Sequence, residues 1–213
     1  MRVLILIPIV IVLFFSIIFH EIAHGLMAER HGDPTARIMG RITLNPIPHI
    51  DPIGTILLPG IMIIMNLFGG TLPVFGWAKP VPINPHNLNN PKRDMMWIGI
   101  AGPGTNLFIA FILALIFRAL HASAGSLGGM ILFYGVTINL LLAFFNLLPI
   151  PPLDGSRILS GILPERYSYY LAQIEPFGFI ILIILLIGGL FNYLFFVLVR
   201  LSSLLTGTTI FWW

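Results

Sequence analysis

Cysteine is absent from the 213 residues, and charged side chains are scarce. Without cysteine the chain can form no disulfide, no thiolate metal site and no cysteine nucleophile. Only 9% of the residues are charged, against about 25% in typical soluble domains, whereas 57% are hydrophobic. The net charge of +3 is too small for a surface that follows nucleic-acid phosphates. The composition therefore excludes a soluble globular domain, a disordered chain and a nucleic-acid binder, and it indicates a protein embedded in the lipid bilayer.

Five hydrophobic runs predict an all-α polytopic membrane protein, because a transmembrane helix needs about 20 mostly apolar residues. We expect a single membrane-embedded domain over residues 1–213. Within it we expect a core at about 3–155, a tyrosine-rich interfacial segment at 157–175 and a C-terminal helix at 177–200. The runs are Val3–Phe19 (continuing with interruptions to Ala28), Ile53–Phe68, Met95–Leu120, Met130–Leu148 and Phe177–Val199.

Basic residues are divided unequally between the two sides that these runs define. By the positive-inside rule the side with seven of them is cytoplasmic and the side with three is external. We therefore expect a multi-pass protein of the cell membrane whose amino terminus lies outside and whose first run ends at the cytoplasmic side. The two groups are Arg30, Arg37, Arg41, Lys92, Arg93, Arg157 and Arg166 on one side, and Arg2, Arg118 and Arg200 on the other.

The path of the second run stays open, because the chain must return to the side from which it started. Either Ile53–Phe68 is a re-entrant hairpin bent at Pro59–Gly60, or the residues that follow it bring the chain back while buried in protein. The sequence LPVFGWAKPVPINP at 72–85 contains four prolines and cannot form an ordinary helix. We expect a short extended or β re-entrant region there.

The sequence HEIAH, from His20 to His24, lies near the end of the first run. Helical geometry places residues four apart on one face, about 40° from each other and one turn along the axis. This spacing suits two ligands of one Zn²⁺, with Glu21 beside them as a general base. The alternative is a pair of packing histidines, but three ionisable residues near a membrane helix end are costly and usually functional.

A catalytic zinc usually has three protein ligands, and without cysteine the third must be His, Asp or Glu. Asp154 follows the fourth run and is expected at a similar depth to the two histidines, since both runs end on the same side. The alternative is a simple Asp-Gly turn, but the combination with HEIAH favours the ligand. The other candidates lie in presumed loops or turns or on another helix face: His31, His49, His86, His121, Glu29, Asp33 and Asp51.

HEIAH and the later sequence NLLPIPPLDG (146–155) together resemble the site-2 protease family of intramembrane zinc metalloproteases. The sequences GPGTN (102–106) and FGWAKPVPINP (75–85) add to the resemblance, which covers most of Phe19–Gly155. It implies a compact member without PDZ or CBS domains that cleaves transmembrane protein substrates. It also implies residue roles: zinc ligands His20, His24 and Asp154, the water-activating base Glu21, and Asn146 as a stabiliser of the oxyanion.

Two other interpretations belong to different classes: a transporter or metal-binding membrane protein, and an inactive relative that only binds other membrane proteins. Neither accounts as well for Glu21 between the two histidines. Asn106, in the third run, is expected to form hydrogen bonds between helices, as asparagine commonly does in membranes. The sequence does not define the substrate or the oligomeric state.

A helical substrate must unwind before cleavage, and its freed backbone groups then need partners within the membrane. We expect Val74–Ile83 to form a strand that receives the substrate by β-augmentation. Pro80 and Pro82 lack donors on one edge, so substrate would bind the edge formed by Lys79, Val81 and Ile83. The segment Ile42–Asn45 is a candidate partner strand. The idea weakens if it occupies that edge, and the alternative is that the prolines only stiffen a loop.

Overall fold

The computed structural model describes residues 2–69 and 76–208, which contain helices and no strand. Four of the helices are long and apolar enough to cross a membrane. The prediction of an all-α polytopic membrane protein is therefore confirmed. The four spans are Ile7–Arg30, Pro91–Ala119, Leu127–Asn146 and Glu165–Leu185.

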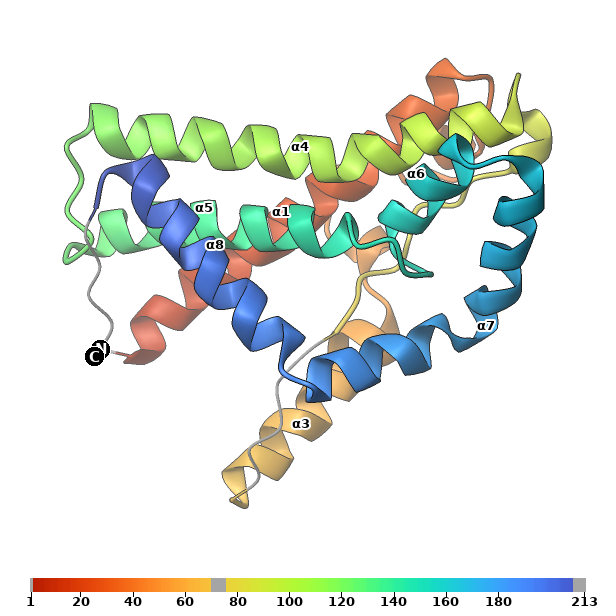
Figure 1. The fold of residues 1–213 in the computed structure, drawn as a ribbon. Coiled ribbons are helices and arrows are strands. Elements are labelled where there is room, and N and C mark those ends of the chain that lie inside the picture. The colour runs from red at the N-terminus through yellow and green to blue at the C-terminus, as the bar shows by residue number, and fades with distance from the viewer. Residues whose placement is uncertain (1, 70–75, 209–213) are drawn as a thin grey trace.

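Three helices form the centre of the molecule: α1 (Arg2–Arg30), α4 (Pro91–Ala119) and α5 (Leu127–Asn146). Figure 1 shows α4 and α5 running side by side, with α1 crossing behind them. Small residues such as Ala110 and Ala114 of α4 are buried against α5 and against α8 (Leu190–Thr206). Small side chains let membrane helices approach closely, so this packing holds α4, α5 and α8 together.

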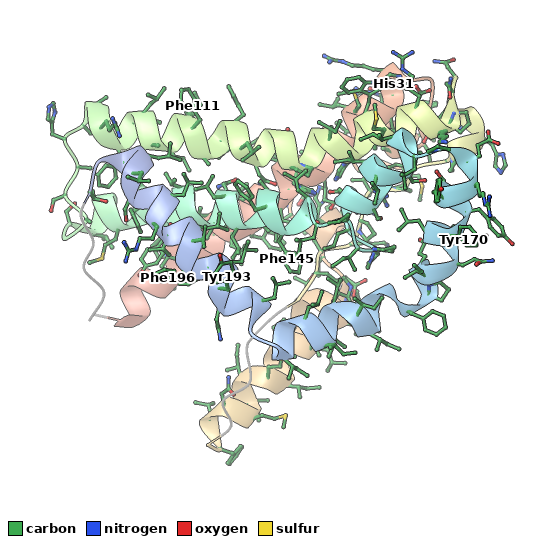
Figure 2. All side chains as sticks on the ribbon, in the orientation of Figure 1. His31, Phe111, Phe145, Tyr170, Tyr193 and Phe196 are labelled. Atoms are coloured by element: carbon green, nitrogen blue, oxygen red, sulfur yellow. The ribbon has the colours of Figure 1, made fainter. Side chains whose placement is uncertain are left out.

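The outer surface of the helices is strongly apolar. Phe111 on α4 and Phe196 on α8 project outward, with more than half of each side chain exposed (Figure 2). Exposed apolar patches on this scale are rare on soluble proteins, whereas a lipid bilayer covers them without cost. The surface is therefore that of a multi-pass membrane protein.

The second hydrophobic run forms one helical segment, a short π-helix η2 (Pro52–Leu57) that continues into α3 (Leu58–Leu67). Of the two paths that the sequence leaves open, the hairpin bent at Pro59–Gly60 is not formed, because the helix continues through both residues to Leu67. The 16 residues span only about 24 Å, less than the roughly 30 Å hydrocarbon core. At Trp77 the chain has returned to the beginning of this helical segment. The N–H of Trp77 donates to the carbonyl of Gly54, in η2, at 3.1 Å.

The return segment 76–84 is extended but pairs with no strand in the described part of the chain. The predicted β-strand over Val74–Ile83 is therefore wrong for residues 76–83, while residues 74 and 75 lie outside the described residues. Its expected partner Ile42–Asn45 forms no strand, and residues 42–44 are bends. The physical reason is that the backbone donors of the segment are bound elsewhere, as described below.

The C-terminal part consists of α6 (Asp154–Ile162), α7 (Glu165–Ile187) and α8. The predicted boundary between an interfacial segment 157–175 and a helix 177–200 is wrong. Helix α7 continues through Pro176, and the apolar run breaks instead at Gly188–Gly189. Gly189 has a φ of +87°, a left-handed conformation that favours glycine and ends helices. As a result α7 and α8 turn away from one another (Figure 1).

Candidate active site

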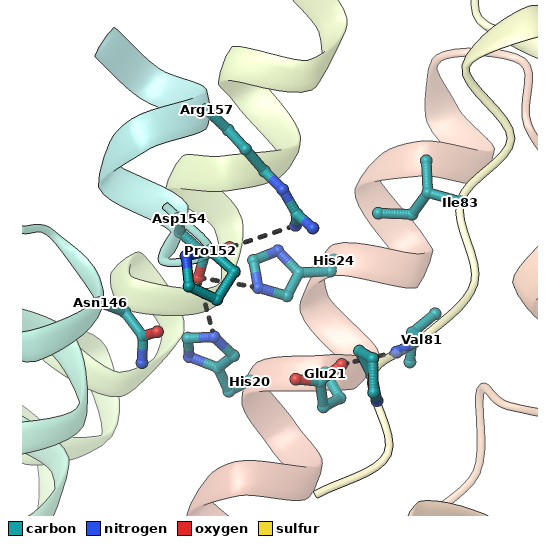
Figure 3. Close-up of a pocket in the computed structure, with 10 residues that line it drawn as sticks. His20, Glu21, His24, Val81, Ile83, Asn146, Pro152, Asp154 and Arg157 are labelled. Carbon is teal, nitrogen blue, oxygen red and sulfur yellow. Dashed lines mark hydrogen bonds and ion pairs between the residues drawn. The ribbon is translucent and has the colours of Figure 1, made fainter. Parts of the chain in front are cut away.

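The two histidines of HEIAH lie on one face of α1, as their spacing predicts, and both are buried. Asp154, the first residue of α6, reaches them from the opposite side (Figure 3). Its Oδ2 lies 3.0 Å from Nε2 of His20 and 3.1 Å from Nε2 of His24. The structure thus brings together the three residues that the sequence identifies as candidate ligands, with ligand atoms within 4.8 Å of one another.

The hydrogen bonds of the imidazoles leave both Nε2 atoms available to a cation. Nδ1 of His24 lies 2.6 Å from the carbonyl oxygen of Ile98, which can only accept, so Nδ1 carries the proton. Nδ1 of His20 donates in the same way to Oδ1 of Asn106 at 2.5 Å. In the neutral imidazoles each Nε2 therefore presents a lone pair to the Asp154 carboxylate, and these acceptors repel one another unless a cation lies among them. Two imidazoles and a carboxylate, each imidazole held by a second partner, form a donor set typical of zinc.

Helix α4 leaves space at the point where the two imidazoles converge. A Cβ added to Gly102 would lie 2.4 Å from Nε2 of His24 and 2.6 Å from Nε2 of His20. Any residue other than glycine would fill the position next to both nitrogens. The glycine therefore forms one wall of the space that a metal ion needs.

Glu21 lies next to the candidate ligands and lines a cavity of about 120 Å³. Its Oε2 accepts a hydrogen bond of 2.7 Å from the backbone N–H of Val81 (Figure 3). The carboxylate is thus held between α1 and the return segment, at the edge of a space large enough for a few water molecules. The cavity is lined by His20, Glu21, His24, Pro80, Val81, Ile83, Asn146, Pro152, Asp154 and Arg157.

Asn146 is the last residue of α5 and faces the cavity on the side of His20 (Figure 3). Its Nδ2 donates to the Leu142 carbonyl at 2.9 Å. An asparagine amide has two N–H donors, so the second is left for a group in the cavity. The arrangement can therefore supply one donor to a bound peptide.

Two polar residues at the site were not recognised as part of it from the sequence. Nη1 of Arg157 lies 3.3 Å from Oδ1 of Asp154, the carboxylate oxygen that faces away from the imidazoles. The spacing of three residues on one helix is the signal that could have indicated this pair. Asn106 does connect helices, as expected, but it also contacts His20 directly.

The edge of the return segment that was expected to bind substrate faces the protein. The N–H of Lys79 donates to the His49 carbonyl at 2.9 Å, and Arg41 donates to the Lys79 carbonyl at 2.6 Å. With the N–H of Val81 bound to Glu21, two of the three expected donors have internal partners. Val81 and Ile83 nevertheless line the cavity through their side chains.

A buried constellation of HExxH and aspartate in a helical membrane protein defines the class of membrane-embedded zinc metallopeptidases. The comparison with known proteins is specific: a family model described as Peptidase family M50 matches residues 8–123 and 122–188. The chain belongs to this family, and no solved structure matches it.

Relatives from several organisms agree with this assignment. The candidate zinc metalloprotease YwhC of Bacillus subtilis is 40% identical over 191 residues, which are 86% of this chain and 82% of YwhC. The candidate zinc metalloprotease Rip2 of Mycolicibacterium smegmatis is 33% identical over 188 residues, 86% of this chain and 68% of Rip2. The zinc metalloprotease MJ0392 of Methanocaldococcus jannaschii is 28% identical over 160 residues, 75% of this chain and 35% of MJ0392. The prediction of an intramembrane zinc metalloprotease is confirmed.

Proposed function

We propose that His20, His24 and Asp154 hold one catalytic Zn²⁺ and that the enzyme hydrolyses peptide bonds within or near the transmembrane segments of other membrane proteins. The observation that carries the proposal is the convergence of two Nε2 lone pairs on the Asp154 carboxylate, with both Nδ1 atoms bound elsewhere. Bound zinc supplies a Lewis acid that acidifies water and polarises a peptide carbonyl.

Glu21 is the general base in this proposal. Its Oε2 is held by the N–H of Val81, which orients the carboxylate and leaves Oε1 to accept a proton from a water molecule in the cavity. The resulting carboxylic acid can return that proton to the leaving amine. Holding the base in one orientation keeps proton transfer within hydrogen-bond reach throughout the reaction.

Asn146 is the proposed oxyanion donor. One amide N–H is bound to the Leu142 carbonyl, which fixes the plane of the amide, and the other is available to a tetrahedral oxyanion. A donor held in place before reaction stabilises developing charge without reorganisation, and loss of one such donor typically costs about 10²–10³ in kcat.

The wall of the cavity opposite Asp154 is the proposed contact surface for the unwound substrate. It consists of the return segment around Val81 and Ile83, and Lys79 fixes the segment through its backbone hydrogen bonds to His49 and Arg41. Because the N–H of Val81 is bound to Glu21, substrate contacts Val81 and Ile83 through side chains or through the proline edge. This proposal replaces pairing along the donor edge.

We also propose that the site lies near the cytoplasmic side of the cell membrane. The seven basic residues that the positive-inside rule assigns to the cytoplasm lie in or next to helix ends on one side of the bundle. These are the end of α1, the start of α4, helix α6 and the start of α7. In Figure 1 these elements gather at one end of the bundle, whereas the loop between α4 and α5 lies at the other.

The test is co-expression with a panel of single-span membrane proteins, comparing the wild type with Glu21→Gln. We expect cleavage products only with the wild type, and equal zinc content in both purified proteins, because Glu21 is not a proposed ligand. Turnover by Glu21→Gln should fall by about 10²–10⁴ or more. Turnover near that of the wild type would reject the general base, and full zinc retention in both His20→Ala and Asp154→Ala would reject the metal site.

A further inference from the structure

A chain of polar side chains lies buried among the three central helices, on the side of His20 that faces away from Asp154. Asn106 of α4 and Asn139 of α5 have no solvent exposure, and Ser16 of α1 is also buried. Nδ2 of Asn106 donates to Oδ1 of Asn139 at 2.9 Å. Nδ2 of Asn139 donates to Oγ of Ser16 at 2.9 Å. Polar groups in such a position are costly unless every member has a partner, and here each of the three has one.

Two backbone carbonyls determine the direction of every hydrogen bond in this chain. Nδ2 of Asn139 lies 2.9 Å from the Gly135 carbonyl, and Nδ2 of Asn106 lies 3.2 Å from the Ser16 carbonyl. Because a carbonyl only accepts, both of these amide atoms must be nitrogen. The Asn106 atom that faces His20 is therefore the oxygen, and it requires a donor on the imidazole.

We propose that Asn106 and Asn139 are positioning residues that keep the proton of His20 on Nδ1 and so present an unprotonated Nε2 to the metal. The inference rests on the proposed role of His20 as a zinc ligand. For His24 the proton is kept on Nδ1 by the backbone carbonyl of Ile98, which a side-chain substitution does not remove. The two ligands are thus oriented by different means, and only that of His20 depends on side chains.

A purely structural role for these amides makes a different prediction. If they only hold the helices together, their replacement lowers the stability of the fold and leaves the zinc affinity of the folded protein unchanged. If they position His20, zinc affinity falls even where the fold is intact. Removal of a group that orients a metal-bound histidine typically costs 10- to 100-fold in metal affinity.

The experiment measures zinc affinity of the purified full chain by competition with a chelator, together with thermal unfolding. Asn106→Leu leaves the His20 proton without an acceptor, so affinity should fall 10- to 100-fold. Asn106→Asp keeps an acceptor oxygen toward Nδ1 of His20, and a carboxylate is a common partner of a metal-bound histidine, so affinity should stay within about threefold. Asn139→Leu should cost roughly 3- to 10-fold, less than Asn106→Leu because the Ser16 carbonyl still holds Asn106.

Thr137→Val is the matched control. Thr137 is buried on the same helix as Asn139 and contacts Oγ of Ser202 on α8 at 2.9 Å, outside the chain that ends at His20. It should lower stability without changing zinc affinity.

The outcomes separate this inference from the proposed function. Full zinc retention by His20→Ala overturns the assignment of the ligand itself. Loss of zinc from His20→Ala, with Asn106→Leu and Asn139→Leu within twofold of the wild type, overturns only the positioning role. If Asn106→Leu does not fold, Asn139→Leu decides: affinity equal to that of Thr137→Val contradicts the inference.

Discussion

Replacing Gly102 with alanine tests the metal site by the smallest change that the chain offers. The added Cβ would lie 2.4 and 2.6 Å from the Nε2 atoms of His24 and His20, closer than the 3.0 Å below which real Cβ contacts essentially never occur. Both imidazoles must therefore move away from their present positions. Forcing a side chain about 30° from its rotamer costs about 0.5–1.5 kcal/mol, so two imidazoles cost about 1–3 kcal/mol.

That energy corresponds to a loss of roughly 5- to 150-fold in zinc affinity, since each 1.4 kcal/mol is tenfold. The fold itself should survive, because alanine favours a helix over glycine by about 1 kcal/mol. We expect Gly102→Ala to show weakened zinc binding in chelator competition and reduced proteolysis, at an unfolding temperature close to that of the wild type.

Gly104→Ala is the control for this change. It lies two residues along the same helix, and a Cβ added there meets no atom within 4 Å. It should bind zinc as the wild type does and be equally or more stable. Zinc affinity of Gly102→Ala equal to that of Gly104→Ala would refute the reasoning that the imidazoles converge on the surface of α4.

Three further predictions concern the orientation of Glu21, the topology, and Asp33, which accepts a hydrogen bond from the Asn84 N–H at the end of the return segment. Val81→Pro removes the N–H that holds Glu21, so turnover should fall while zinc content is retained; unchanged cleavage at equal expression would contradict the orienting role. In this cysteine-free chain, Arg2→Cys should react with an impermeant thiol reagent from outside the cell, and labelling only from the cytoplasm would invert the topology. Burial raises the pKa of Asp33, but hydrogen bonds from Thr35, Asn87 and Asn84 outweigh it and hold the pKa below its usual range. Its stabilising contribution should therefore be complete above about pH 4 and be lost as the pH falls further, and Asp33→Ala should lack this acid-dependent loss in unfolding measurements.

The sequence was sufficient for the residues whose positions follow from helix geometry. His20 and His24 share a face because they are four residues apart on a helix. Asp154 meets them because both hydrophobic runs end on the same side of the bundle. These inferences needed only local periodicity and the alternation of membrane spans.

The remaining features depend on how the helices approach one another, which periodicity does not specify. The closeness of Gly102 to the imidazoles and the contact of Asn106 with His20 arise only when α1 and α4 are packed. Periodicity likewise does not specify which edge of the return segment faces the protein, because that depends on the partners of Lys79 and Val81 in the packed structure. The glycine pair at 188–189 is visible in the sequence, but an apolar run can continue through glycine in a membrane.

Contacts between Gly54 and Trp77 close a loop of the chain that contains α3. The N–H of Trp77 donates to the Gly54 carbonyl, the Thr55 hydroxyl donates to the Trp77 carbonyl at 2.8 Å, and a Cβ on Gly54 would lie 2.3 Å from the indole. The residues beyond this closure can therefore be lengthened or shortened without changing the register of the segment that reaches Glu21. The length of α3 can thus change without moving the catalytic residues. An epitope inserted after Phe68, an exposed residue at the far end of α3, should therefore leave the catalytic geometry unaltered. Its accessibility would report on the surroundings of that helix in an active enzyme.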